Sequence, residues 1–158
     1  MAALKKQNLI SPIKQAVALG TPLLGICLGM QLLFKESVEH EVTEGLNLIP
    51  GKVIPIPRFE ELPIPHMGWN QIELRKSTRL TRGLGDKFDG YFAHSYRAYE
   101  QKDEVVGICS YTEDMPVIVA KDNIYGLQFH PEKSGNSGLK ILRNFKEMCY
   151  ENYTICRH

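Results

Sequence analysis

One cysteine, Cys27, lies in a setting that could make it a nucleophile. It is the centre of Gly-Ile-Cys-Leu-Gly at residues 25–29, with a short apolar run before it and helix-forming residues after it. A strand, a sharp turn and a helix in this order place the nucleophile of many hydrolases on an elbow. The two glycines would let backbone and helix pass close together, and the helix N-terminus would favour the thiolate. The alternative is a buried structural cysteine beside two turn glycines.

A base for that thiol, and a group to orient the base, are offered by His130-Pro131-Glu132. This triplet follows the apolar residues 125–129, which are typical of a strand. With Pro131 fixing the turn, Glu132 could hold one nitrogen of the His130 ring while the other nitrogen faces Cys27. The alternative is a surface His-Pro-Glu turn.

The elements that must position these groups begin in an α/β order. Apolar spacing predicts a helix over residues 10–19 that ends at Gly20. The unbroken apolar run at 23–26 predicts a strand buried on both faces, as in a parallel sheet. Residues 30–34 are good helix formers, so a second helix should follow the cysteine.

The second half of the chain is rich in β-forming residues up to a closing helix. That helix is predicted over 137–150, with Leu139, Leu142, Phe145 and Met148 on the face packed against the sheet. The predicted strands span residues 51–56, 69–74, 91–99, 105–111, 117–120 and 125–129.

Composition limits the functions that need to be considered. The 158 residues, 43% of them apolar and 23% charged, predict a single folded domain over residues 1–158. The net charge of +1 argues against a nucleic-acid partner. No apolar run reaches the length of a membrane span or a signal peptide, so we expect a cytoplasmic protein without membrane contact.

The cysteines do not form a disulfide framework. Cys27, Cys109, Cys149 and Cys156 are few and widely spaced, and none are paired as Cys-x-x-Cys. Cys109 lies in an apolar segment and is predicted to be a buried, inert thiol.

Four motifs in a fixed order resemble the class I glutamine amidotransferases. They are Gly-Ile-Cys-Leu-Gly-Met-Gln at 25–31, Pro-His-Met-Gly-Trp-Asn at 65–70, Tyr-Phe-Ala-His-Ser-Tyr at 91–96 and Gly-Leu-Gln-Phe-His-Pro-Glu-Lys-Ser at 126–134. Within that family, the second and fourth motifs are most similar to the glutaminase subunit of imidazole glycerol phosphate synthase. The resemblance implies an α/β, flavodoxin-like fold with a mixed sheet flanked by helices.

The resemblance also implies a reaction and its residues. Cys27 would attack the side-chain amide of glutamine, His130 would protonate the departing ammonia, and Glu132 would orient His130. The backbone N–H of Leu28 would bind the oxyanion. Water would then release glutamate, without metal or cofactor.

Substrate contacts follow from the same resemblance. Gln31 would help to hold the bound glutamine, although it could instead be a surface residue of its helix. The strand around His94, Ser95 and Tyr96 would contact the α-carboxylate and amine. His66 and His94 lack the paired spacing of a zinc site, so we assign them no metal.

A protein partner is implied as well. Trp69, Asn70, Tyr91 and Lys133 match positions that face the cyclase subunit of the synthase, with which the chain would form a heterodimer and to which it would pass ammonia for histidine biosynthesis. A core tryptophan is the alternative for Trp69. Two other functions stay open: an amidotransferase subunit that serves another synthase, such as a sugar amidotransferase, and an interaction-only subunit without catalysis.

The front of the chain departs from the family pattern. Members normally begin with strand-helix units that supply central strands and a glycine-rich loop, and this chain begins with a helical segment. We therefore expect an N-terminally incomplete domain that lacks about 60 residues, if two such units are missing. We also expect it to be less stable and less active than a chain extended upstream.

Overall fold

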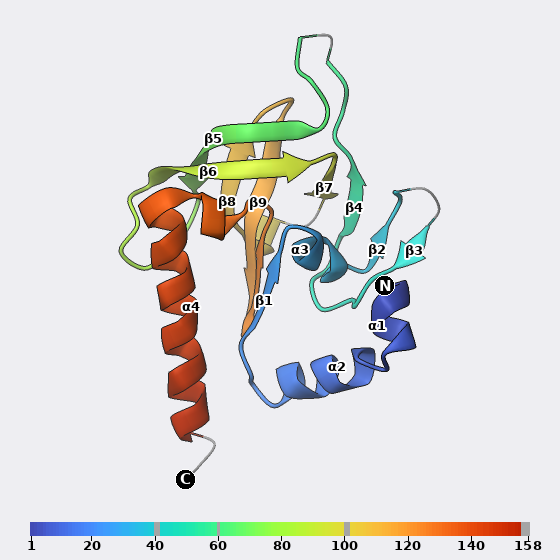
Figure 1. The fold of residues 1–158 in the computed structure, drawn as a ribbon, viewed down its shortest axis with the longest axis vertical. Helices are drawn as coiled ribbons and strands as arrows, with labels where there is room; N and C mark the ends of the chain where they lie inside the picture. The colour runs from blue at the N-terminus through green and yellow to red at the C-terminus, as the bar shows by residue number, and fades with distance from the viewer. Residues whose placement is uncertain (40–41, 60, 100–101, 156–158) are drawn as a thin grey trace.

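The strands form two sheets in the computed structural model, which describes residues 1–39, 42–59, 61–99 and 102–155 (Figure 1). Within these residues, one sheet of six strands has the order β1 (Leu23–Ile26), β10 (Ile124–Leu127), β9 (Asp114–Lys121), β8 (Val105–Ser110), β5 (His66–Leu74) and β6 (Lys87–His94). The pairing of β1 with β10 is parallel and the others are antiparallel, which confirms the predicted mixed sheet.

A second sheet of four strands lies beside the first. Its order is β3 (Thr43–Glu44), β2 (Glu36–Ser37), β4 (Lys52–Pro55) and β7 (Tyr96–Tyr99). The sequence predicts one strand over 91–99, but the chain leaves the first sheet after His94 and enters the second at Tyr96. Ser95 is the corner, and its carbonyl accepts a hydrogen bond from the Ile56 N–H at 3.0 Å.

The helices are α1 (Ala2–Lys6), α2 (Ile10–Ala18), α3 (Leu28–Leu32) and α4 (Gly135–Ile155), with short 3₁₀ turns η1 (Lys102–Glu104) and η2 (Pro131–Lys133). The predicted end of α2 is confirmed, because Gly20 has φ +86°, a conformation that glycine adopts at little cost. β1 has the predicted bounds, but only Gly25 in it is buried. Leu24 and Leu23 pack against two different apolar clusters, which agrees with a strand covered on both faces, although neither side chain is fully buried.

Two apolar clusters lie on opposite faces of the six-stranded sheet. One contains Ile141 and Met148 of α4, packed against residues of β5, β6, β8, β9 and β10. The other contains Met30 of α3 and Phe34, packed against Val53 of β4 and against β9 and β10. Figure 1 shows α4 on one side of the sheet and α3 on the other. No helix in the described ranges is long and apolar enough to cross a bilayer.

The predicted buried face of α4 is correct at Phe145 and Met148, which pack in the core, and wrong at Leu139, which is 45% exposed. Ile141, which was not predicted, is buried. At the start of this face, an added Cβ on Gly138 would lie 2.0 Å from the carbonyl oxygen of Pro131. Gly138 and the residues three and ten positions later therefore face the core, and Leu139 faces solvent.

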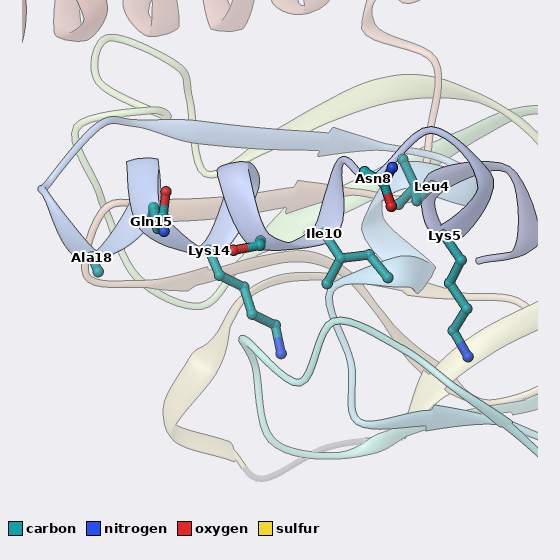
Figure 2. A pocket seen from close by; sticks show the side chains of 8 residues that line it. Leu4, Lys5, Asn8, Ile10, Lys14, Gln15 and Ala18 are labelled. Atoms are coloured by element: carbon teal, nitrogen blue, oxygen red, sulfur yellow. The ribbon is translucent and has the colours of Figure 1, made fainter.

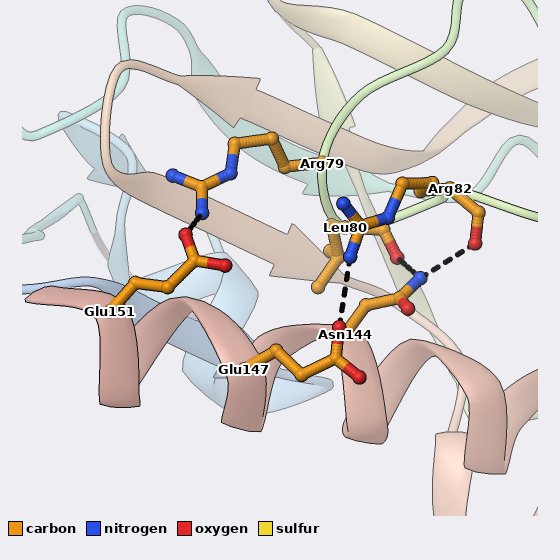
Figure 3. Close-up of polar contacts among 6 residues, drawn as sticks. All are labelled: Arg79, Leu80, Arg82, Asn144, Glu147 and Glu151. Atoms are coloured by element: carbon orange, nitrogen blue, oxygen red, sulfur yellow. Dashed lines mark hydrogen bonds and ion pairs between the residues drawn. The ribbon is translucent and has the colours of Figure 1, made fainter.

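Polar contacts tie α4 to the loop between β5 and β6 (Figure 3). The buried Asn144 amide donates to the carbonyls of Leu80 and Arg82, both at 2.9 Å. Arg82 also pairs with Glu147 at 2.8 Å, and a second exposed arginine–glutamate pair lies further along the helix. Because exposed ion pairs contribute little, the buried amide is the main polar contribution to this attachment.

Candidate active site

Cys27 lies at the elbow between β1 and α3. Its backbone has φ 51° and ψ −110°, and its N–H donates to the Leu127 carbonyl of β10 at 2.7 Å. A positive φ is uncommon for a residue with a side chain and persists where the surroundings enforce it. The parallel pairing of β1 with β10 and the start of α3 together hold this conformation.

The two glycines of the elbow differ in how closely other atoms approach them. A Cβ on Gly25 would lie 2.5 Å from the carbonyl oxygen of Gly29, so strand and helix approach as closely as the sequence predicts. A Cβ on Gly29 itself would meet nothing within 4 Å. The expectation that both glycines serve close approach is therefore wrong for Gly29, which lies on the open side of α3.

The thiol of Cys27 is half-buried among polar groups. Its Sγ lies 4.0 Å from the carbonyl oxygen of Ala93 and 3.9 Å from Nε2 of Gln128. Burial raises the pKa of Cys27, the Leu28 N–H lowers it, and the charge of Glu132 raises it. The net shift is upward: the N–H at the start of α3 favours the thiolate, as the sequence predicts, but burial has the larger effect.

His130 and Glu132 are brought together as the sequence predicts. Nδ1 of His130 lies 2.9 Å from Oε1 of Glu132, and the carboxylate must be the acceptor. Nε2 of His130 is therefore the nitrogen left to exchange protons. The His130 N–H donates to the Tyr91 carbonyl at 2.8 Å, which anchors the strand end to β6.

The carbonyl of Tyr96 organises the predicted substrate residues. It accepts hydrogen bonds from Nδ1 of His94 at 2.8 Å and from Nε2 of Gln31 at 3.1 Å. A neutral His94 must then accept at Nε2, so the His66 ring, 3.0 Å away, donates through its Nδ1. The register of β5 and β6 pairs these two histidines directly.

The His66 ring is enclosed by aromatic groups and is kept neutral. It stacks against Phe92 at 4.6 Å and Tyr111 at 4.0 Å between ring centroids, and it is 2% exposed. Burial, followed by the nearby His94, lowers the pKa of His66 from 6.5 to about 4. Burial also lowers the pKa of His94, with a smaller contribution from His130.

The lowered pKa of His66 makes folding depend on pH. Below pH 6.5 the unfolded chain binds a proton at this residue, whereas the folded chain does not until about pH 4, so stability falls across that window as the pH drops. We expect His66 to account for a loss of about 2 kcal/mol in unfolding free energy between pH 7 and pH 5. Urea denaturation of wild type and His66→Gln at both pH values measures this. An equal change with pH in both proteins would contradict it.

Gln128 is a site residue that sequence reasoning did not assign. Its side chain is fully buried, its Oε1 accepts from Nε2 of Gln31 at 3.1 Å, and its Nε2 points at Sγ of Cys27. The available signal was an amide inside the apolar residues 124–129. A carboxamide in such a run is unusual and needs buried hydrogen-bond partners.

A small hollow lies beside the elbow. It is lined by Leu28 and Gln31 together with residues of β2 and β3. Ser95 and Tyr96 lie at the corner between the two sheets, and the Tyr96 hydroxyl donates to the Glu39 carbonyl at 3.1 Å. Of the predicted substrate residues, Gln31 lines the hollow itself, and Tyr96 is tied to the hollow through Glu39, one of its lining residues.

Three of the four predicted partner-facing residues lie together on what we call the β5–β6 surface, formed by Met67, Trp69, Tyr91 and Lys133. Met67 is 65% and Trp69 59% exposed. The Trp69 and Tyr91 rings meet edge to face at 6.1 Å, and Nζ of Lys133 lies 5.5 Å from the centre of the Tyr91 ring.

Asn70 is not part of that surface. Because side chains alternate along β5, it lies on the opposite face from Trp69, and its Nδ2 is 3.5 Å from Nε2 of His66. Its assignment to a partner-facing position stays a prediction.

Other features carry no site residue. Figure 2 shows an open hollow formed by α1 and α2, and it contains none of the residues above. Its lining mixes apolar and polar side chains: Leu4, Ile10, Ala18, Asn8, Ser11, Gln15, Lys5 and Lys14. Across the described ranges, no group of three His, Cys, Asp or Glu side chains could hold a metal ion. Cys109 is buried as predicted, and burial, followed by Asp114, raises its pKa to about 12. Cys156 lies outside the described residues.

Comparison with known proteins agrees with this geometry. Residues 3–148 match the model of the family described as glutamine amidotransferase class-I. The imidazole glycerol phosphate synthase subunit HisH of Listeria monocytogenes is 45% identical over 150 residues, covering 95% of this chain and 72% of the relative. The protein of the same name from Lactococcus lactis is 50% identical over 148 residues, covering 93% and 72%.

Solved structures show the same fold at lower identity. A structure described as a glutamine amidotransferase superposes with a TM-score of 0.68 at 21% identity, over 92% of this chain and 70% of that one. A glutamine amidotransferase from Thermotoga maritima gives a TM-score of 0.57 at 18% identity, over 95% and 56%.

Proposed function

We propose that this chain, which belongs to the class I glutamine amidotransferase family, hydrolyses L-glutamine to glutamate and ammonia through Cys27, His130 and Glu132. The observation that carries the assignment of roles is the 2.9 Å contact of His130 Nδ1 with Glu132. His130 lies three residues beyond the end of β10, the strand that pairs with β1 before the Cys27 elbow. That contact leaves His130 Nε2 as the proton-exchanging atom.

The reaction proceeds through an acyl-enzyme. His130 Nε2 takes the proton of the Cys27 thiol as Sγ attacks the side-chain amide carbon of glutamine. The oxyanion accepts a hydrogen bond from the Leu28 N–H at the start of α3. His130 then gives its proton to the departing nitrogen, so ammonia leaves and a thioester remains. Water, deprotonated by His130, attacks the thioester and releases glutamate and the free thiol.

The hollow beside the elbow is the proposed glutamine site. Gln31 and the backbone of His94, Ser95 and Tyr96 would hold the α-carboxylate and amine, with the side-chain amide reaching Cys27. Both hydrogens of the Gln31 amide already have protein acceptors, which leaves its Oε1 directed to the ligand.

The chain is proposed to act as the glutaminase subunit of an imidazole glycerol phosphate synthase in histidine biosynthesis, since the relatives above carry that name. Its ammonia would pass to a cyclase subunit in a heterodimer. The β5–β6 surface is the proposed docking site, because two large apolar side chains are exposed there beside a cation–aromatic pair. A subunit that serves another synthase would keep the chemistry and change the partner.

The test is glutamine-dependent ammonia release, measured with and without the cyclase subunit. We expect release that rises when the cyclase is added, and we expect Trp69→Ala to weaken cyclase binding by about 30-fold. Tyr150→Ala is the matched control, because it removes an exposed aromatic from α4, outside the β5–β6 surface.

Three outcomes would overturn parts of the proposal. Cyclase binding with no ammonia release in any mixture would indicate an interaction-only subunit. Ammonia release that rises with a sugar-converting synthase and not with the cyclase would indicate the other amidotransferase function. Equal binding by Trp69→Ala and wild type would remove the β5–β6 surface from the contact.

A further inference from the structure

We propose that Gln128 is a positioning residue for the glutaminase reaction, acting on Gln31 on one side and on Cys27 on the other. Its carboxamide bridges the two: Oε1 accepts from Gln31 at 3.1 Å, and Nε2 points at Sγ of Cys27 at 3.9 Å. The inference rests on the proposed function. It adds Gln128, which belongs neither to the triad nor to the proposed substrate contacts.

The orientation of both carboxamides follows from one backbone atom. The Tyr96 carbonyl can only accept, so the group that Gln31 turns toward it must be the NH2. The second hydrogen of that NH2 then points at Gln128, which must present its oxygen. The NH2 of Gln128 is therefore the group that faces Cys27. Reversing the amide of Gln128 would bring two NH2 groups together.

The position of Gln128 is fixed as firmly as its orientation. Its side chain is fully buried, and its backbone N–H donates to the Val117 carbonyl of β9 at 2.9 Å. A buried carboxamide loses its water and needs compensating partners, which Gln31 and Cys27 supply. An apolar side chain of the same length would fill the space and lose both contacts.

Two consequences follow for the reaction. With its NH2 held at both hydrogens, Gln31 keeps its oxygen free toward the substrate hollow, so Gln128 should affect glutamine affinity through Gln31. An N–H directed at Sγ should also favour the thiolate over the thiol, opposing the effect of burial. The charge of Glu132 also acts on the thiol, and the test leaves Glu132 unchanged.

The test compares Gln128→Met, Gln31→Met and the double variant in two assays. In the first, KM for glutamine should rise about tenfold in Gln128→Met, as expected for one lost hydrogen bond, and the same substitution should change KM little when Gln31→Met is already present. In the second, the rate of Cys27 alkylation by iodoacetamide should fall about fivefold at pH 7, and its pH profile should move upward.

A second variant covers the case in which Gln128→Met does not fold. Gln128→Glu keeps an acceptor oxygen for Gln31 and, when ionised, has no donor for Sγ, so it should change the alkylation profile more than KM. Urea denaturation of each variant shows whether it is folded.

The alkylation assay separates this inference from the proposed function, because it needs no turnover. Absence of ammonia release by wild type would remove the function, while the thiol assay would still test the contact of Gln128 with Cys27. Folded Gln128 variants with the wild-type alkylation profile and wild-type KM would overturn the proposal. Equal, additive effects of the two Met substitutions on KM would mean that Gln128 does not affect glutamine affinity through Gln31.

Discussion

Cys27→Ala is expected to lower the rate of glutamine hydrolysis by about 10⁴-fold or more, because no other group in the site can form the acyl-enzyme. The thiol lies at the elbow beside Glu132, and burial raises its pKa above the ordinary value. The measurement is the initial rate of ammonia release at saturating glutamine. Binding of the cyclase subunit should be unchanged, since Cys27 is not part of the β5–β6 surface.

Cys109→Ala is the matched control for this substitution. Its thiol is buried in β8, and burial, with Asp114, raises its pKa to about 12, so it should contribute no nucleophile. We expect a kcat close to that of wild type, with some loss of stability from the cavity. Activity that survives Cys27→Ala and disappears in Cys109→Ala would contradict the proposal, because the nucleophile would then be Cys109.

The raised pKa of Cys27 has a mechanistic consequence. A thiol that burial keeps protonated must give its proton to a base during attack, whereas a preformed thiolate would need none. In the proposed mechanism, His130, held at Nδ1 by Glu132, would therefore be required for the first step as well as for ammonia departure. The start of α3 would contribute the Leu28 N–H as a hydrogen-bond donor.

The parts of the site that could be predicted are those encoded by short local patterns. The elbow is five residues long, and His130 and Glu132 are separated by one proline, so strand-turn-helix and strand-turn signals are sufficient for both. The resemblance to a family then supplied Gln31 and the strand around His94. The bounds of α2 and β1 follow from apolar spacing and from Gly20 in the same way.

The parts that could not be predicted depend on contacts between distant segments. His66 and His94 meet because the register of β5 and β6 pairs them, and Gln128 meets Gln31 across 97 residues. Leu139 was wrongly assigned to the buried face of α4 because Gly138, which packs on the Pro131 carbonyl, carries no apolar side chain to mark that face. Spacing of apolar residues alone therefore favoured Leu139.

Gly25→Ala is expected to destabilise the protein by about 3 kcal/mol and to lower the rate of ammonia release by about 100-fold. The new Cβ would lie 2.5 Å from the carbonyl oxygen and 2.6 Å from the carbonyl carbon of Gly29. These are backbone atoms, which cannot rotate away as a side chain does, so β1 and α3 must separate. The separation would move Cys27 and the Leu28 N–H relative to His130 by a distance comparable to the clash.

The matched control is Gly29→Ala, at the other glycine of the same motif. Its Cβ would meet nothing within 4 Å, and alanine is the better helix former, so we expect unchanged or slightly higher stability. Urea denaturation measures the unfolding free energy of both variants, and an ammonia-release assay measures the activity of Gly25→Ala. Equal stability of the two variants would mean that β1 and α3 can separate freely. In that case the elbow would not be held by close packing, and the positive φ of Cys27 would need another cause.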